Sequence, residues 1–115
     1  MAALYVQKEH RMQLADLEQS EREIIRQCLN AAVHGPFFPD WEFHALFGLE
    51  RGEVKYVLDV WSGLDDSKKE VRSAINNSLN NLLGYPHGCE KEWSLFISVS
   101  RSEVERIFKK WRGSV

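Results

Sequence analysis

RGEVKYVLDVWSG occupies residues 51–63, and RSEVERIFKKWRG occupies residues 101–113, fifty positions later. Both stretches read Arg-x-Glu-Val at the start and Trp-x-Gly at the end. In the first copy, Val54, Val57 and Trp61 recur at the spacing of one face of a helix. These stretches therefore predict one helical unit that the chain uses twice.

The repeat extends over most of the chain. Segments 22–63 and 72–113 align without gaps and share 11 of 42 positions, where ordinary residue usage gives roughly 6 % by chance. The identical pairs are Arg22/Arg72, Ile25/Ile75, Leu29/Leu79, Asn30/Asn80, Pro36/Pro86, Glu42/Glu92, Arg51/Arg101, Glu53/Glu103, Val54/Val104, Trp61/Trp111 and Gly63/Gly113. We interpret the chain as a tandem duplication.

Length and composition indicate one globular domain: the chain has 115 residues, of which 43 % are hydrophobic and 28 % charged. Two halves of this size would each be marginal alone, so we expect them to share a core around an approximate two-fold axis. We predict a single domain over residues 1–115, with an N-terminal arm (1–19), a first half-unit (20–63) and a second half-unit (64–115).

The first helix of each half-unit is marked by an apolar stripe that covers residues 24–33 and recurs over 74–83. Gly and Pro follow at 34–36 and 84–86, which predicts that both helices end there. A Ser with a Glu three residues later is the pattern of a capping box, which marks the first turn of a helix. The pairs are Ser20/Glu23, Ser67/Glu70 and Ser100/Glu103.

The middle of each half-unit is ambiguous. Residues 40–47 suit a short helix that ends at Gly48, whereas residues 93–99 alternate apolar and polar side chains as a strand does. We favour short helices and an all-α fold, because an isolated pair of strands is marginally stable. The alternative is an α+β fold with a two-stranded ribbon formed by residues 42–48 and 92–99.

Charge and cysteine content limit the possible settings. A net charge of −2 gives no general attraction to nucleic acid or anionic lipid. The apolar run 1–6 is too short for a signal peptide, and no stretch approaches the roughly 18 apolar residues of a membrane span. With only Cys28 and Cys89, a reduced cytoplasmic setting without membrane association is the simplest expectation.

Two places differ most between the copies and are candidates for binding a partner protein. The loop around Phe37, Phe38 and Trp41 carries aromatic side chains that its counterpart lacks, and such side chains dominate many protein interfaces. The alternative is that they plug the open end of the shared core. The extra amides of Asn76, Asn77 and Asn81 could bind a peptide or a base edge, or could serve the structure.

Residues 100–113 support a second hypothesis, a DNA-binding regulator. Each half-unit has the apolar spacing of a helix-turn-helix motif, and the second copy ends in a segment of net charge +3. Its candidate phosphate contacts are Arg101, Arg106, Lys109 and Lys110. Cations near the C-terminal end of a helix also stabilise its dipole without any ligand.

A metal site or an enzyme is a third hypothesis, with His34, His44, His87 and Cys89 as the candidate ligands or catalytic groups. His87 and Cys89 are a possible ligand pair, but no second tight pair completes a tetrahedral site. The chain has no phosphate-binding glycine loop and no nucleophile motif. We therefore expect a non-enzymatic protein–protein interaction module that needs no cofactor.

Overall fold

The computed structural model describes residues 12–113, which form helices and no strands. The helices are η1 (Leu14–Asp16), α2 (Gln19–His34), α3 (Asp40–Phe47), α4 (Arg51–Asp59), η2 (Trp61–Gly63), α5 (Lys69–Gly84), η3 (Glu90–Glu92), α6 (Trp93–Phe96) and α7 (Arg101–Arg112). The all-α prediction is confirmed. No helix in this part of the chain combines the length and apolar character that a membrane crossing requires.

The alternative ribbon is wrong, because both of its segments contain helices. Phe43 and Phe47 in α3 are buried four residues apart, as one face of a helix requires. Trp93 and Ile97 are buried at the corresponding positions, while Leu95 between them is 77 % exposed. The apparent alternation in this segment therefore came from an apolar side chain that faces solvent.

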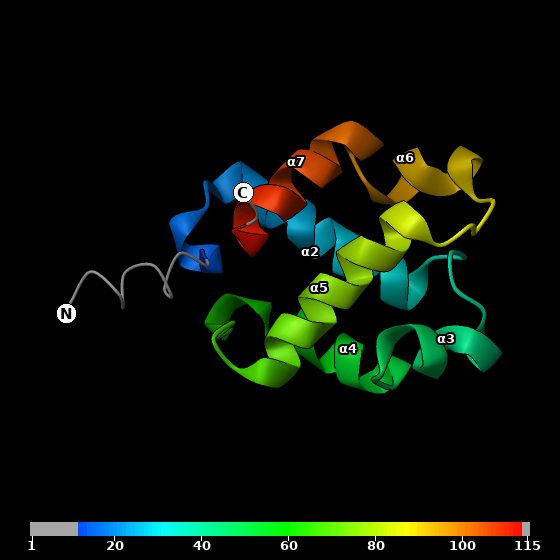
Figure 1. Cartoon of the computed structure of the whole chain (residues 1–115), viewed down its shortest axis with the longest axis horizontal. Coiled ribbons are helices and arrows are strands. Elements are labelled where there is room, and N and C mark those ends of the chain that lie inside the picture. Colours follow the sequence, from blue (N-terminus) through cyan, green and yellow to red (C-terminus); the bar gives the residue numbers. More distant parts are fainter. Residues whose placement is uncertain (1–11, 114–115) are drawn as a thin grey trace.

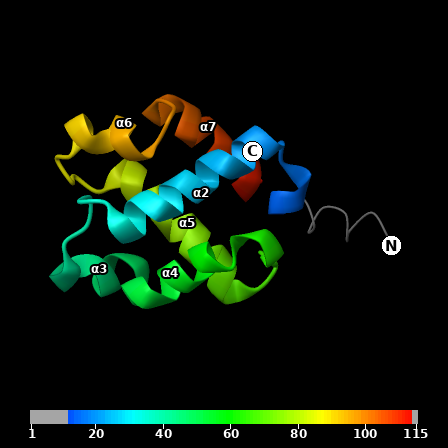
Figure 2. The ribbon, with the colours of Figure 1, turned by 180° about the vertical axis from the view of Figure 1, so that it is seen from behind.

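Two long helices, α2 and α5, cross at the centre of the molecule (Figure 1). Helices α3 and α4 lie on one side of this pair and α6 and α7 on the other, and the view from behind shows the same arrangement (Figure 2). α2 contacts α4, α6 and α7, and α5 contacts α3, α4 and α7. Each central helix thus packs against flanking helices from both halves of the chain.

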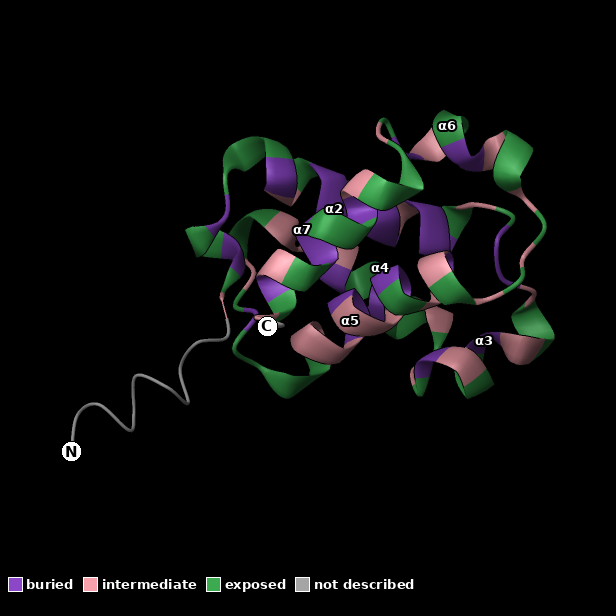
Figure 3. Cartoon of the chain, turned by 45° about the horizontal axis from the view of Figure 1, so that its top comes forward, coloured by how far each residue is buried: buried purple, intermediate pink, exposed green. Residues whose placement is uncertain are grey.

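The core follows the inner faces of these helices (Figure 3). Ile25 and Leu29 of α2 are completely buried, as are Ile75 and Leu79 of α5. Within each pair the residues are four positions apart, so both side chains lie on the face that meets the opposite helix. Packing therefore accounts for two of the identities between the copies.

The helix ends are only partly as predicted. α2 and α5 end at His34 and Gly84, as expected, but they begin differently. The capping box of α2 uses Glu18 and Glu21, and α5 begins after Lys68 without a side-chain cap. The Ser20/Glu23 and Ser67/Glu70 predictions are therefore wrong. Ser100 does cap α7, accepting the backbone N–H of Glu103 at 3.3 Å.

Arg51 and Arg101 have matching positions and matching contacts. Arg51 donates to the carbonyl oxygens of Ala32 and Val33 at the end of α2, and its guanidinium lies 4.3 Å from the centre of the Phe43 ring. Arg101 donates to the carbonyl of Leu83 near the end of α5, and lies 5.3 Å from the centre of the Trp93 ring. The shared arginines therefore join the end of each long helix to the following short helix.

The expected arm (1–19) is described from Met12 onward, and residues 1–11 lie outside the described part of the chain. Leu14 is buried, and its backbone N–H donates to the buried carboxylate of Asp66 at 2.9 Å. The same carboxylate accepts the indole N–H of Trp111 at 3.0 Å. Arg72 donates to the carbonyl oxygen of Met12 at 3.0 Å. The start of the described chain is thus held against the first turns of α5 and the end of α7.

Candidate functional site

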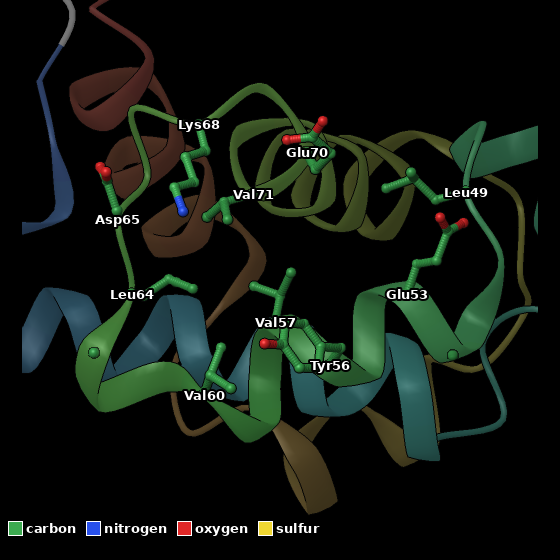
Figure 4. Close-up of a pocket in the computed structure, with 12 residues that line it drawn as sticks. Leu49, Glu53, Tyr56, Val57, Val60, Leu64, Asp65, Lys68, Glu70 and Val71 are labelled. Atoms are coloured by element: carbon green, nitrogen blue, oxygen red, sulfur yellow. The ribbon is translucent and has the colours of Figure 1, made fainter.

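The strongest candidate site is a groove of about 580 Å³ between α4 and the start of α5 (Figure 4). Val57 of α4 and Val71 of α5 face each other across it, and Tyr56 stands at its edge with 65 % of its surface exposed. Its apolar lining is Leu49, Tyr56, Val57, Val60, Leu64 and Val71. We call it the α4/α5 groove.

The rim of the α4/α5 groove is mainly acidic. Glu53, Asp65 and Glu70 contribute three negative charges, and Lys68 contributes one positive charge. The side-chain hydroxyl and backbone N–H of Ser67 lower the pKa of Asp65 below its ordinary value, so this carboxylate is charged near neutral pH. An apolar floor with an acidic rim suits an apolar segment that carries basic residues.

A second groove lies between α7 and the start of α2, and several of its lining residues are fifty positions from those of the α4/α5 groove. It has the same kind of floor, with Val99 and Ile107 in place of Leu49 and Val57. Its rim carries Glu21, which is 5 % exposed and binds two cations of α7. We call it the α2/α7 groove.

The ion pairs of Glu21 close part of the α2/α7 groove. Arg106 approaches its carboxylate to 3.2 Å and Lys110 to 2.9 Å. Burial alone would raise the pKa of Glu21, but the hydrogen bonds from Lys110, from the backbone N–H of Glu18 and from Arg106 hold this pKa below its ordinary value. The carboxylate therefore remains charged and paired.

None of these three charged residues has a charged counterpart in the α4/α5 groove. Fifty positions from Glu21 the chain has Val71, and fifty positions before Arg106 and Lys110 it has Tyr56 and Val60. All three of these residues line the open groove. Residues fifty positions apart therefore line two grooves of different character, one crossed by ion pairs and one open and apolar.

The three aromatic residues predicted to bind a partner separate into two groups. Phe37 is 1 % exposed and Phe38 is 3 % exposed, so both are core residues, which fits the alternative that they plug the core rather than bind a partner. Phe37 contacts the rings of His87 and Phe96, because the loop folds back over the ends of the long helices. Trp41 is 82 % exposed on α3 and is not among the residues that line the α4/α5 groove.

The three asparagines predicted to bind a partner make hydrogen bonds within the chain. Asn77 donates to the carbonyl oxygen of Phe47 at 2.8 Å, and Asn81 donates to that of Leu46 at 3.1 Å. Asn76 donates to the side chain of Asn77. Asn77 and Asn81 therefore hold the end of α3 against α5, which is the structural use that we gave as their alternative role.

The candidate metal ligands do not form a cluster. Among residues 12–113, no group of three or more His, Cys, Asp or Glu side chains is placed to hold a metal ion. His44 pairs with Glu50 at 2.9 Å, while His34 is exposed. His87 accepts the backbone N–H of Cys89 through Nδ1. A hydrogen bond thus joins His87 and Cys89. The positions of the four candidate residues give no support to a shared metal site.

The cations proposed to contact DNA are engaged with the protein itself. Arg106 pairs with Glu103 at 2.7 Å as well as with Glu21, and Lys109 pairs with Glu105 at 3.4 Å. Lys110 pairs with Glu21, and Arg101 binds the end of α5. The first helix of the expected motif, α6, has only four residues. DNA binding remains a prediction, which salt-dependent binding of a duplex would test.

Comparisons with protein-family models, with curated proteins and with solved structures found no match.

The α4/α5 groove was missed from the sequence, although one signal was present. Tyr56, Val60 and Val71 stand where the other copy has Arg106, Lys110 and Glu21. In the sequence these differences lie in separate helices. Only the packing of α4 against α5 shows that they meet on one surface.

Proposed function

We propose that this protein is a non-enzymatic interaction module that binds an apolar segment of a partner protein in the α4/α5 groove. The observation that carries the proposal is the contrast between the two grooves. One holds Glu21 with its cations, while the other leaves Tyr56 exposed and Val60 and Val71 partly exposed, with no such covering in the described residues. Exposed apolar surface of this kind is typical of binding sites.

The dimensions and charge of the groove suit a peptide. Its volume of about 580 Å³ lies within the usual range of binding pockets. A helix or an extended segment that places two or three apolar side chains on one face would fit between α4 and α5. Lys or Arg beside those side chains would meet Glu53, Asp65 and Glu70, which favours basic over acidic segments.

We further propose that the groove arose by tandem duplication, since packing and cation contacts recur at positions fifty residues apart. Arg51 and Arg101 support this interpretation, because both bind the end of a long helix and stack on an aromatic ring. After duplication, one groove would carry the charged residues Glu21, Arg106 and Lys110. The other would carry the apolar residues Tyr56, Val60 and Val71 at the matching positions. The two unpaired cysteines, Cys28 and Cys89, support a cytoplasmic setting.

The test transplants the charges of one groove into the other. The triple variant Tyr56→Arg, Val60→Lys, Val71→Glu places the side chains of Arg106, Lys110 and Glu21 at the matching positions. Peptides would be selected from a phage-displayed random library on the wild-type protein, and their affinities measured by fluorescence anisotropy. We expect at least a tenfold loss of affinity in the triple variant.

The matched control is Leu95→Ser, which removes an exposed apolar side chain on α6, outside the groove. It should bind the selected peptides as the wild type does. Circular dichroism and thermal unfolding would verify that the triple variant remains folded. Selected peptides that bind the folded triple variant and the wild type equally would contradict the proposal, as would a library that yields no binding peptide.

A further inference from the structure

We infer that the chain's own N-terminal arm docks in the α4/α5 groove and competes with a partner for it, with Leu4, Tyr5 and Val6 as the apolar contacts. This inference rests on the groove of the proposed function but adds its regulation. Three features support it: the place where the described chain begins, the length of chain before that place, and the match of apolar and charged residues between arm and groove.

The chain enters the described structure next to the groove. The backbone N–H of Leu14 donates to Asp66 at 2.9 Å, and the residue before Asp66, Asp65, lines the groove. Leu64 lines both the groove and an adjoining hollow that also contains Leu14. Figure 4 shows the N-terminal ribbon, in blue, at this end of the groove beside Asp65 and Leu64. A segment that precedes Met12 therefore starts near the Leu64 end of the groove.

The arm is long enough to cover the groove. Five residues, 7–11, separate Val6 from Met12, and an extended chain spans roughly 3.3–3.6 Å per residue, so Val6 can reach about 20 Å from Met12. α4 has nine residues, which corresponds to a helix of about 13 Å. This tether is longer than α4, so residues 4–6 can enter the groove from its Leu64 end without displacing Leu14 from the core.

The composition of the arm matches the groove. Leu4, Tyr5 and Val6 form an apolar run that suits a floor of valine and leucine. Lys8 and Arg11 follow in the stretch that would pass the acidic rim. The tether also raises the effective concentration of the arm at the groove to about the millimolar range, so weak contacts suffice for docking.

The experiment places a nitroxide spin label at position 3 of the full chain. The variant is Ala3→Cys with Cys89→Ser, because Cys89 is partly exposed whereas Cys28 is completely buried and would not react in the folded protein. Methyl NMR signals would be compared with the label oxidised and reduced. We expect strong broadening of Val57, Val60, Leu64 and Val71, and none of Val99 and Ile107 in the α2/α7 groove.

A second set of variants tests the contacts. Leu4→Asp with Val6→Asp should abolish the broadening and raise the affinity for peptides selected as above at least fivefold, while Gln7→Asn should change neither. If the groove methyls are not broadened in the full chain, the arm inference is overturned even where peptides bind. If they are broadened but no peptide binds either form, the arm inference stands and the proposed function fails.

A mixed sample decides which molecule provides the arm. Spin-labelled protein without isotopes would be mixed with isotope-labelled protein that has no spin label. Docking within one chain predicts no broadening in this mixture. Broadening there, at the intensity seen in the doubly labelled chain, would overturn docking within one chain and show exchange of arms between two copies.

Discussion

The carboxylate of Glu21 lies 2.9 Å from the ammonium group of Lys110, although 89 positions separate the two residues. Glu21 also bonds Arg106 and the backbone N–H of Glu18. The start of α2 is therefore joined to the end of α7 by a buried acid whose partners reach solvent, and this contact is absent from the groove that we propose as the binding site.

Replacing Glu21 by Gln should lower the free energy of unfolding near neutral pH by about 1–2 kcal/mol. This expected loss is smaller than the loss from breaking a fully buried ion pair, because the side chains of Lys110 and Arg106 are 35 % and 51 % exposed. Urea unfolding measures it. Glu105→Gln is the control, since the exposed Lys109–Glu105 pair contributes about 0–0.5 kcal/mol.

The difference in the free energy of unfolding between wild type and Glu21→Gln should depend on pH with a definite sign. The pKa of Glu21 is lower in the folded protein than its ordinary value of 4.5. Its contribution to stability is therefore complete well above pH 4.5 and is lost as the pH falls through the lowered pKa. The gap between wild type and Glu21→Gln should shrink as the solution becomes more acidic. A gap that grows in acid would contradict the assignment.

Asp66→Asn should be more harmful, because Asp66 is 3 % exposed and holds three groups at once. Its carboxylate accepts the N–H of Leu14 and the indole N–H of Trp111, and pairs with Arg72 at 3.4 Å. The amide cannot replace the charge, so we expect a loss of about 2–4 kcal/mol in urea unfolding. The Leu14 amide should also exchange faster with deuterium.

The control for Asp66 is its neighbour Asp65, whose conversion to Asn should leave the midpoint of unfolding nearly unchanged. Asp65 is exposed, and within the described residues its side chain hydrogen-bonds only to Ser67. Equal effects of the two substitutions would show that the buried carboxylate does not hold the N-terminal segment in place.

Arg51→Lys tests why this arginine recurs. Arg51 reaches the carbonyl oxygens of Ala32, Val33 and Phe38 with two different nitrogens while stacking on Phe43. A lysine ammonium has no planar fork, so it would lose most of these bonds and the stacking. We expect a loss of about 1–2 kcal/mol in urea unfolding. Lys55→Arg, at an exposed pair on the same helix, should have little effect.

Much of the fold could be predicted from the sequence because local signals decide it. The helix of residues 40–47 ends at Gly48 as predicted, because Gly48 adopts the left-handed conformation, with φ of 67°, that commonly ends helices. The starts of α2 and α5 could not be predicted, because Glu18 displaced the expected cap Ser20 and α5 has no side-chain cap. Several residues fit a capping pattern equally well, and packing selects among them.

The candidate site was harder to predict, because sequence distinguishes which residues differ between copies but not which of them are exposed. Phe37 and Trp41 looked alike in the sequence, yet one is 1 % exposed and the other 82 %. Whether each side chain is buried depends on the path of the loop over the helix ends. Likewise, Tyr56 and Val71 lie on different helices and become one surface only after α4 packs on α5.

Ser78→Ala is expected to stabilise the protein. Ser78 is completely buried, and within residues 12–113 its hydroxyl is the one buried side-chain polar atom that lacks a hydrogen-bond partner. Removing an unsatisfied hydroxyl from the core recovers its desolvation cost, so the free energy of unfolding should rise by about 1 kcal/mol. Ser78→Cys introduces the residue found fifty positions earlier, Cys28, and should do the same while keeping the volume filled. Ser73→Ala, at a partly exposed position of the same helix, should change the unfolding midpoint little. A Ser78→Ala protein that unfolds at clearly lower urea concentration would mean that the hydroxyl has a partner in the folded protein.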